Sequence, residues 1–249
     1  MVKTIIYSLV AGVIGTVIGG LISVFLGRRG DKFISYLLAF AGGFMLAIVC
    51  FDLIPESMEK SNIWIVLSSI AVGLILVILF EYLIDYSTSK FSRLRHMEDN
   101  SKNKSMFRVG IIMTIAIAMH NLPEGLAIGA SIAIDNGIII SILICLHNIP
   151  EGMAMATPMI TSGTKWWKIL LYTALTGFPT VIGAIIGYLI SDISIVFVSA
   201  CLAIAAGFML YIVFCEMLPT AMAMQNNKKL SSIIVIISFM LGAMLIYLI

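Results

Sequence analysis

Runs of about 20 apolar residues recur along this chain, and they constrain its fold more than any other feature. A helix of about 20 apolar residues spans the hydrocarbon core of a bilayer. Apolar residues make up 61% of the sequence and charged residues only 11%, which is too little charge to cover a soluble core of this size. The sequence therefore predicts an all-α membrane protein.

We expect eight transmembrane helices in a single transmembrane domain, residues 1–249. The expected spans are 4–27, 33–55, 63–85, 107–132, 137–159, 167–190, 194–222 and 232–249. The first run is too long for the apolar region of a signal peptide, so we expect it to remain as a helix. Most connections are short. The polar stretch 86–105 is the exception, and we expect it to be a flexible loop.

The positions of Lys and Arg orient these helices. Of the 15 Lys and Arg residues, all except Lys3 and Lys60 lie in the connections that follow odd-numbered spans or at the start of the next span. Positive residues accumulate on the cytoplasmic side of a membrane. We therefore expect the loop 86–105 in the cytoplasm, both termini outside, and a multi-pass protein of the cell (inner) membrane.

Segments of the first half resemble segments of the second half. The matched segments are 12–23 with 180–191, and 38–57 with 202–221. The second match aligns Asp52 with Glu216, each three residues before a proline. Matched spans cross the membrane in opposite directions, so we predict an inverted repeat of spans 1–3 and 6–8 with a central pair, spans 4 and 5. Inverted repeats are typical of secondary transporters whose binding site lies at the midplane.

The two central spans each contain the motif His-Asn-x-Pro-Glu-Gly, at 120–125 and 147–152, which uses two of the three histidines. Ionisable residues inside a membrane are rare and are usually functional. A His and a Glu four residues apart share one face of a helix. Two such faces would offer imidazole nitrogens and carboxylate oxygens to a divalent metal, from His120, Glu124, His147 and Glu151.

Imidazole and carboxylate ligands suit Zn²⁺ and other divalent ions of the first row. They do not choose among Zn²⁺, Fe²⁺, Mn²⁺, Co²⁺ and Cd²⁺. The structural alternative is a buried His–Glu hydrogen bond that joins two helices without a metal. Each motif proline also removes a helical N–H and frees the carbonyl four residues earlier.

The doubled motif on the fourth and fifth of eight helices resembles the ZIP (Zrt/Irt-like) family of divalent metal transporters, in particular its bacterial ZupT/GufA-like branch. The acid-x-x-Pro endings of spans 2 and 7 are similar as well. The resemblance implies import of Zn²⁺ and related ions through a two-metal centre. It also implies an elevator-like motion and a homodimer.

The same resemblance implies the ligands of each metal. One metal would be held by His120, Glu124, His147 and Glu151. The second would be held by Asn121, Asn148 and Glu216, with the two motif glutamates as bridges.

An intramembrane zinc metalloenzyme, such as a hydrolase, is the main alternative function. Such an enzyme needs fixed ligands, an open water position and a separate acid or base. The near-duplicate ligand sets and the lack of a His-Glu-x-x-His motif favour transport, so we expect no enzyme. Export is the other alternative, since only the resemblance indicates import. Metal ions and the lipid bilayer are the expected partners, and nucleic acid is not.

Three further acids are candidates for an ion pathway. Asp52 and Glu56 lie in the outer half of span 2, and Glu216 lies somewhat inside the middle of span 7. We predict that Asp52 and Glu56 receive the ion from outside and that Glu216 passes it inwards. A solvated helix end is the alternative for the first two. Glu81, near the inner end of span 3, is interpreted as a side chain that reaches the membrane interface.

Overall fold

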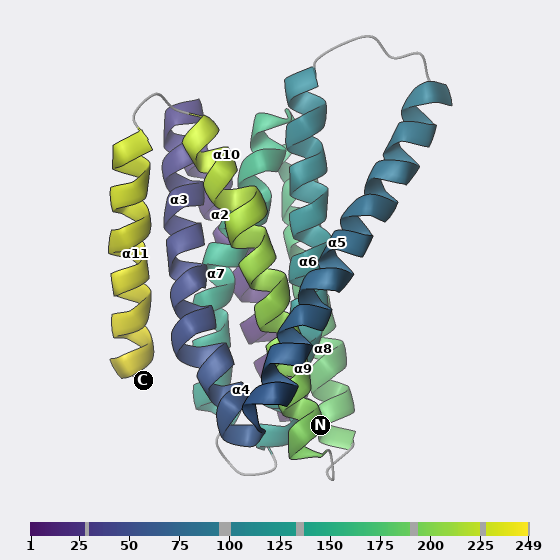
Figure 1. Ribbon diagram of the computed structural model, residues 1–249, viewed down its shortest axis with the longest axis vertical. Helices are drawn as coiled ribbons and strands as arrows, with labels where there is room; N and C mark the ends of the chain where they lie inside the picture. Colours follow the sequence, from purple (N-terminus) through teal and green to yellow (C-terminus); the bar gives the residue numbers. More distant parts are fainter. Residues whose placement is uncertain (28–29, 95–100, 133–136, 190–193, 225–227, 249) are drawn as a thin grey trace.

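The computed structural model describes residues 1–27, 30–94, 101–132, 137–189, 194–224 and 228–248. These residues are almost entirely helical and contain no strand, which confirms the predicted all-α class. The helices lie side by side along one long axis (Figure 1). Their bounds are α1 Val2–Ser8, η1 Leu9–Ile14, α2 Gly15–Gly27, α3 Asp31–Ile48, η2 Val49–Leu53, α4 Ile54–Lys60, α5 Ile63–Leu94, α6 Ser101–Ile132, α7 Gly137–Thr161, α8 Trp166–Leu189, α9 Ile195–Tyr211, η3 Ile212–Met217, α10 Leu218–Ala223 and α11 Lys228–Leu248.

These elements join into eight long rods. The π-helical segments η1, η2 and η3 each continue directly from one α-helix into the next, because the junction residues keep helical backbone angles. In the described part of the chain, seven rods are long and apolar enough to cross a membrane. The eighth, α7, is 25 residues long. This architecture agrees with the expected transmembrane helices.

The ends of α5 and α6 differ from the prediction. We expected a loop over 86–105, but α5 continues to Leu94 and α6 begins at Ser101. The apolar part of α5 does end near the expected place, at Leu83. Lys and Arg are good helix formers, so a helix can continue past its apolar segment. Residues 95–100 lie outside the described residues, and the cytoplasmic location of this stretch stays a prediction.

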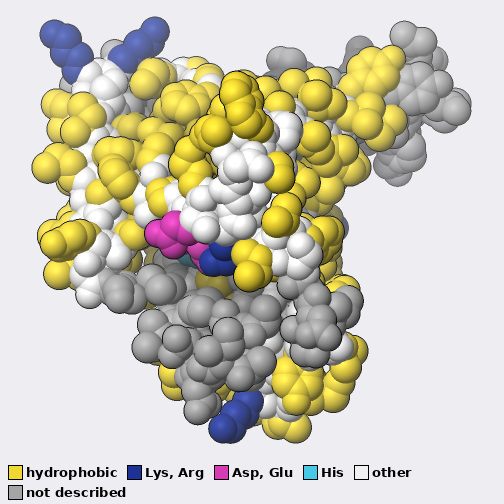
Figure 2. Space-filling view, turned by 60° about the horizontal axis from the view of Figure 1, so that its bottom comes forward, with side chains coloured by type: hydrophobic (Ala, Val, Ile, Leu, Met, Phe, Trp, Pro, Cys, Tyr) yellow, Lys and Arg dark blue, Asp and Glu magenta, His cyan; other side chains and the backbone are white. Residues whose placement is uncertain are grey.

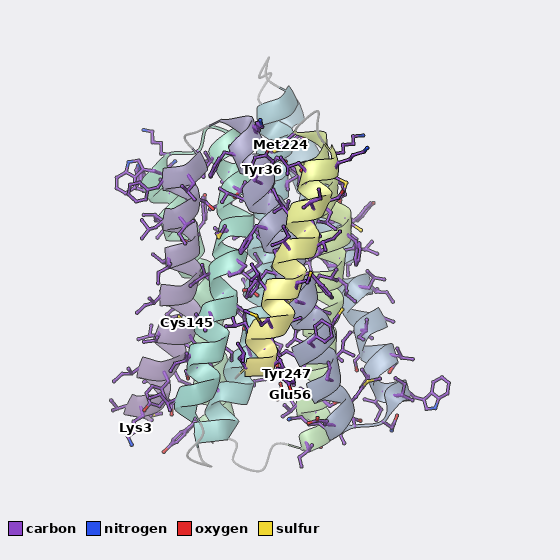
Figure 3. All side chains as sticks on the ribbon, turned by 90° about the vertical axis from the view of Figure 1, so that its left-hand side faces the viewer. Lys3, Tyr36, Glu56, Cys145, Met224 and Tyr247 are labelled. Atoms are coloured by element: carbon purple, nitrogen blue, oxygen red, sulfur yellow. The ribbon has the colours of Figure 1, made fainter. Side chains whose placement is uncertain are left out.

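Two ends of the molecule can be told apart by labelled side chains. Lys3 and Glu56 lie at one end, and Tyr36 and Met224 lie at the other (Figure 3). The predicted orientation makes the end with Lys3 and Glu56 the outer one. The second rod consists of α3, η2 and α4, and it starts at the opposite end and finishes at this one (Figure 1). Asp52, on η2, therefore lies in the half of this rod nearer the end with Glu56.

The rods pack as two groups. In the site group, comprising α1, η1, α2, α6, α7 and α8, α6 packs on α8 and α2 packs on α7. In the flanking group, comprising α3, η2, α4, α5, α9, η3, α10 and α11, α3 packs on α11 and α5 packs on α9. The two groups meet where α3 contacts α7 and where α6 contacts α9.

Glycines bring backbones together inside each group. A Cβ at Gly125 would collide with the carbonyl of Thr180, and a Cβ at Gly152 would collide with the carbonyl of Thr16. In the flanking group, a Cβ at Gly73 would collide with the carbonyl of Ile204. Small residues allow such close helix packing in membranes. Each group is therefore tightly interlocked.

The apolar core continues from one group into the other. It includes the buried methionines Met113 on α6 and Met153 on α7, together with Met45 on α3 and Met209 on α9. Methionine is unbranched and adapts to irregular surfaces. The two groups therefore share one apolar core that includes adaptable side chains from both.

Two π-helical segments occupy matching places in the predicted repeat. Both η2 and η3 end two residues before a proline, Pro55 and Pro219, and they contain Asp52 and Glu216. A proline lacks an N–H and crowds the carbonyl of the preceding turn, and a wider turn relieves that crowding. Such π segments often occur at functional sites. The correspondence supports the predicted alignment of Asp52 with Glu216.

The packing also gives a register for the first and sixth rods. Gly19 packs against the backbone at Ile149 and Met153, and Gly183 packs in the same way at Leu122 and Leu126. These contacts pair Gly19 with Gly183. The sequence match of 12–23 with 180–191 pairs Gly15 with Gly183, which is one helical turn away. Apolar residues of similar size recur every turn in these rods, so the alignment could slide by a turn without losing identities.

Candidate metal centre

The two motifs lie on neighbouring helices that run in opposite directions. His120, Asn121 and Glu124 belong to α6, and their counterparts on α7 follow a short connection. All six side chains are buried, with at most 6% of any residue exposed: His120, Asn121, Glu124, His147, Asn148 and Glu151. Pro123 and Pro150 are inside their helices rather than at the ends. The helices therefore carry the polar groups deep into an apolar core.

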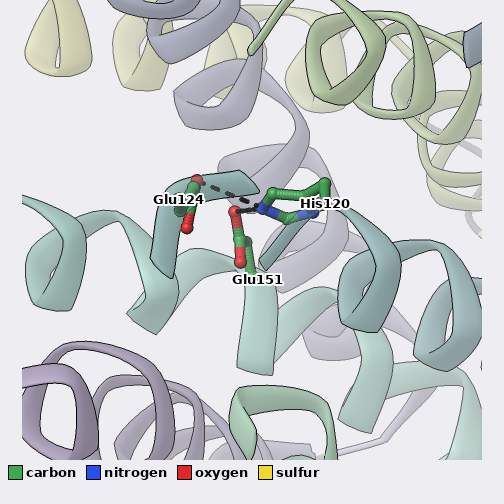
Figure 4. A group of neighbouring side chains, drawn as sticks. All are labelled: His120, Glu124 and Glu151. Atoms are coloured by element: carbon green, nitrogen blue, oxygen red, sulfur yellow. Dashed lines mark ion pairs between the residues drawn. The ribbon is translucent and has the colours of Figure 1, made fainter. Parts of the chain in front are cut away.

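The histidines and glutamates pair across the two helices. Nε2 of His120 lies 2.9 Å from Oε1 of Glu151, and Nε2 of His147 lies 2.9 Å from Oε1 of Glu124. Within α6, Nε2 of His120 lies 3.4 Å from Oε1 of Glu124 (Figure 4). Each glutamate is thus closest to the histidine of the other motif. The four side chains predicted as metal ligands are brought together, and we call them the His/Glu quartet.

Three members of the quartet have their ligand atoms in one small volume. The ligand atoms of His120, Glu124 and Glu151 all lie within 4.8 Å of one another. These three are the only His, Cys, Asp and Glu side chains in the described part of the chain that form a group of three or more close enough to share one ion. His147 contacts it through the shared oxygen of Glu124. The donor types fit a divalent metal of the zinc class.

The hydrogen bonding around the quartet is incomplete. Oε2 of Glu124, both carboxylate oxygens of Glu151 and both ring nitrogens of His120 are buried without a hydrogen-bond partner among the described residues. The 2.9 Å approach of His120 to Glu151 has ion-pair distance but not hydrogen-bond geometry. Buried polar groups without partners cost free energy, and buried charges are normally paired or bound to metals. A divalent cation would satisfy carboxylate oxygens of both glutamates and one ring nitrogen of His120.

The two asparagines are held by the neighbouring rods. Nδ2 of Asn121 donates to the carbonyl of Thr176 on α8 at 2.7 Å, and Nδ2 of Asn148 donates to the carbonyl of Ala11 on η1 at 2.9 Å. Their Oδ1 atoms are buried without a hydrogen-bond partner among the described residues. Each amide is thus oriented with a free oxygen, the atom that a metal would use. The amides themselves do not bond to the quartet in this arrangement.

Sequence reasoning missed the groups that hold the asparagines. The acceptors are backbone carbonyls, at Ala11 and Thr176, so no side-chain pattern could identify them. The hydroxyl of Thr16 adds a link between rods by donating to the carbonyl of Thr173 at 2.8 Å. A threonine in an apolar run is an ordinary observation, and its partner became known only from the packing.

The acids of the predicted pathway are not part of the three-residue cluster. Asp52, on η2, is partly buried and lies within electrostatic range of His147 and Glu124. Glu216, on η3, is buried and lies within electrostatic range of Tyr211 and Cys215. Their roles in binding or conduction stay predictions. Both belong to the flanking group, whereas the quartet belongs to the site group.

Glu56 is paired rather than isolated. Nζ of Lys60 lies 3.0 Å from its Oε1, one turn along α4, and both side chains are about one-third exposed. Seen from the lower end of Figure 1, acidic and basic side chains adjoin on a mostly apolar surface (Figure 2). The ammonium of Lys60 offsets part of the negative charge that Glu56 was expected to offer to ions.

A sequence model described as ZIP Zinc transporter matches residues 85–249, which include both motifs and η3. The chain belongs to the ZIP zinc transporter family. The resemblance proposed from the doubled motif is confirmed.

Individual relatives cover most of the chain. A protein of Chlorobium limicola named zinc transporter ZupT is 38% identical over 86% of this chain and 86% of its own length. Relatives with the same name from Clostridium perfringens and Escherichia coli are 32% and 29% identical, over 86% and 90% of this chain. ZIP members of this kind are named as transporters rather than enzymes, so the metalloenzyme alternative is not favoured.

Proposed function

We propose that this protein is a secondary transporter that imports Zn²⁺ across the cell membrane. The observation that carries the proposal is the buried His/Glu quartet, whose crossed pairs leave carboxylate oxygens without donors. The names of the ZupT relatives support zinc as the ion. Fe²⁺, Mn²⁺, Co²⁺ and Cd²⁺ are further candidate substrates, because the same ligand types accept them.

Within this proposal the quartet binds the first ion. His120, Glu124 and Glu151 supply the atoms that are already close together, and His147, which contacts Glu124, would complete the set. A second ion would use the free oxygens of Asn121 and Asn148 with Glu216, and the motif glutamates would bridge the two.

The proposed orientation follows from the Lys and Arg positions. Both termini lie outside, and the 86–105 stretch lies in the cytoplasm within one transporter domain, residues 1–249. Import as the direction, and assembly as a homodimer, rest on the family resemblance. An ion from outside would pass Asp52, which is within electrostatic range of the quartet, before it reaches Glu124.

The test is zinc flux into proteoliposomes that contain a metal-sensing dye. We expect uptake by the wild-type protein and severely reduced uptake by Glu151→Gln, which keeps the size of the side chain but removes its charge. Glu59→Gln is the matched control, since Glu59 is exposed on α4 and far from the motifs in the chain. A wild-type protein without zinc flux in either direction would refute transport.

A further inference from the structure

A polar cluster joins the two groups of helices at the end opposite to Glu56. Nη2 of Arg108, on α6, donates to Oε1 of Glu81, on α5, at 2.6 Å. The hydroxyl of Tyr211, at the end of α9, donates to Oε2 of the same carboxylate. Glu81 therefore does not simply reach for the membrane interface, as its position in the sequence indicated. Its two carboxylate oxygens accept hydrogen bonds from side chains on α6 and α9.

The members of this cluster come from different groups. Glu81 and Tyr211 both belong to the flanking group, where α5 packs on α9. Arg108 belongs to the site group and lies 12 residues before His120 on α6, about 18 Å along the helix. The hydrogen bonds that orient the two motif asparagines, by contrast, stay inside the site group, Asn121 with Thr176 and Asn148 with Ala11. The bond from Arg108 crosses the boundary.

Between the described residues of α5 and α6 there are few close backbone approaches. A small apolar hollow lies between them and α9, lined by Val77 and Phe80 on α5, Ile112 and Met119 on α6, and Phe208 on α9. In Figure 1, α5 diverges from α6 towards its end at Leu94. The side chains that line it are all apolar, and apolar surfaces can slide past each other while still excluding lipid.

A charged hydrogen bond differs from apolar contact in how it depends on position. It requires a donor–acceptor distance close to 2.8 Å and good alignment, so a displacement of about 1 Å between α5 and α6 weakens it strongly. Methionine contacts adapt to such a displacement. The Arg108–Glu81 bond therefore stabilises one relative position of the two groups over its neighbours.

We propose that Arg108, Glu81 and Tyr211 form a latch that holds the site group against the flanking group in the present arrangement. This inference rests on the proposed transport function, because alternating access requires one group of helices to move against the other. Tyr211 keeps the carboxylate in place within the flanking group, and Arg108 engages it from the moving side. When Arg108 releases Glu81, the site group can move, and access to the quartet changes from one side of the membrane to the other.

The alternative is that Arg108 and Glu81 are independent anchors at the membrane interface, where Arg and Lys are common. Independent anchors and a latch differ in their coupling. Loss of either partner breaks a latch completely, so loss of both adds nothing further. Two independent anchors give effects that add.

The test measures the distance between the groups directly. The four free cysteines, Cys50, Cys145, Cys201 and Cys215, are replaced by serine. Spin labels are then placed at Leu175 on α8 and Ile236 on α11, which are more than half exposed and belong to different groups. Electron–electron double resonance in nanodiscs gives the distance distribution for the parent, Arg108→Gln, Glu81→Gln and the double variant.

We expect the population at a second distance to rise at least about threefold in each single variant, in line with the strength of partly exposed ion pairs. The double variant should shift no further than either single one. Lys60→Gln is the matched control, because it removes an ion pair that lies within α4 alone. Unchanged distributions in both single variants, or shifts that add in the double variant, would overturn the latch.

Zinc flux is measured on the same proteins to separate the two proposals. A coupled shift in distance without zinc flux in the parent refutes zinc transport and leaves the latch in place. Flux in the parent without any coupled shift supports transport and removes the latch.

Discussion

His120 is closer to Glu151 on the neighbouring helix than to Glu124 in its own motif, with Nε2–Oε1 distances of 2.9 Å and 3.4 Å. The reciprocal contact joins His147 to Glu124, also at 2.9 Å. The quartet is therefore one unit made by two helices, and neither motif can form it alone. Loss of one glutamate should disturb the histidine of the other motif as well as its own.

The first prediction concerns this shared construction. We expect Glu124→Ala and Glu151→Ala each to abolish zinc flux, because each removes a charge and a ligand from a buried site. Groups that only support metal ligands typically account for about 10–100-fold in affinity. Loss of a ligand itself should therefore lower the rate at sub-saturating zinc by more than about tenfold. Near-normal flux in a variant that reaches the membrane in normal amount would contradict the assignment.

The second prediction is a loss of flux in acid. Zinc needs neutral imidazole and ionised carboxylate, so protons and zinc compete for the same lone pairs. Lowering the pH raises the protonated fraction of free ligands and therefore weakens zinc binding. Between about pH 7.5 and 5.5, where an ordinary imidazole becomes charged, we expect the initial rate to fall at sub-saturating zinc.

The measurement uses proteoliposomes with equal pH on both sides, so that no proton gradient contributes. Saturating zinc should restore much of the rate, since the competition is for the site. A rate that is constant over this range would exclude imidazole as a ligand in the rate-limiting step.

The third prediction uses the ion pair at the outer end. Asp52 lies within electrostatic range of Glu124, whereas Glu56 is engaged by Lys60 at 3.0 Å. We expect Asp52→Asn to raise the half-saturating zinc concentration more than Glu56→Gln does. Lys60→Gln should lower it by roughly twofold, since exposed pairs are weak. The effect of Lys60→Gln on the half-saturating zinc concentration should be smaller at high salt than at low salt, because salt screens exposed charges. A rise in the half-saturating concentration in Lys60→Gln would remove these acids from the pathway.

The fourth prediction concerns packing behind the motifs. A Cβ at Gly152 would collide with the carbonyl of Thr16, which cannot move without displacing α2. We expect Gly152→Ala to destabilise the fold by about 1–3 kcal/mol, as overpacking usually does. Thermal unfolding in detergent measures this, with Ser68→Ala on the exposed side of α5 as the control. Equal midpoints for both variants would mean that the close approach is not required.

The sequence was sufficient for the helical class, because runs of apolar residues as long as 63–85 have few other structures available to them. It was also sufficient for the membership of the quartet, since a spacing of four residues places His120 and Glu124 on one face. It could not predict that each glutamate lies nearest the opposite histidine. That depends on how α7 is rotated against α6, which neither motif encodes locally.

Two other features could not be predicted from the sequence pattern. The register of the first rod against the sixth was one turn off, because Gly15 and Gly19 are equivalent in composition and only their contacts distinguish them. The role of Glu81 was also misjudged. A carboxylate near a helix end is expected to face water, and its partners Arg108 and Tyr211 are distant in the chain.

The π segment η1 makes the two halves of the molecule unequal. Five residues lead from Ala11, which holds Asn148, to Thr16, which meets Gly152. Only four lead from Thr176, which holds Asn121, to Thr180, which meets Gly125. A chain with two identical halves would open to either side of the membrane with the same free energy. In the proposed transporter, the additional residue in the first rod is one of the differences that would give the outward-facing and inward-facing states unequal free energies.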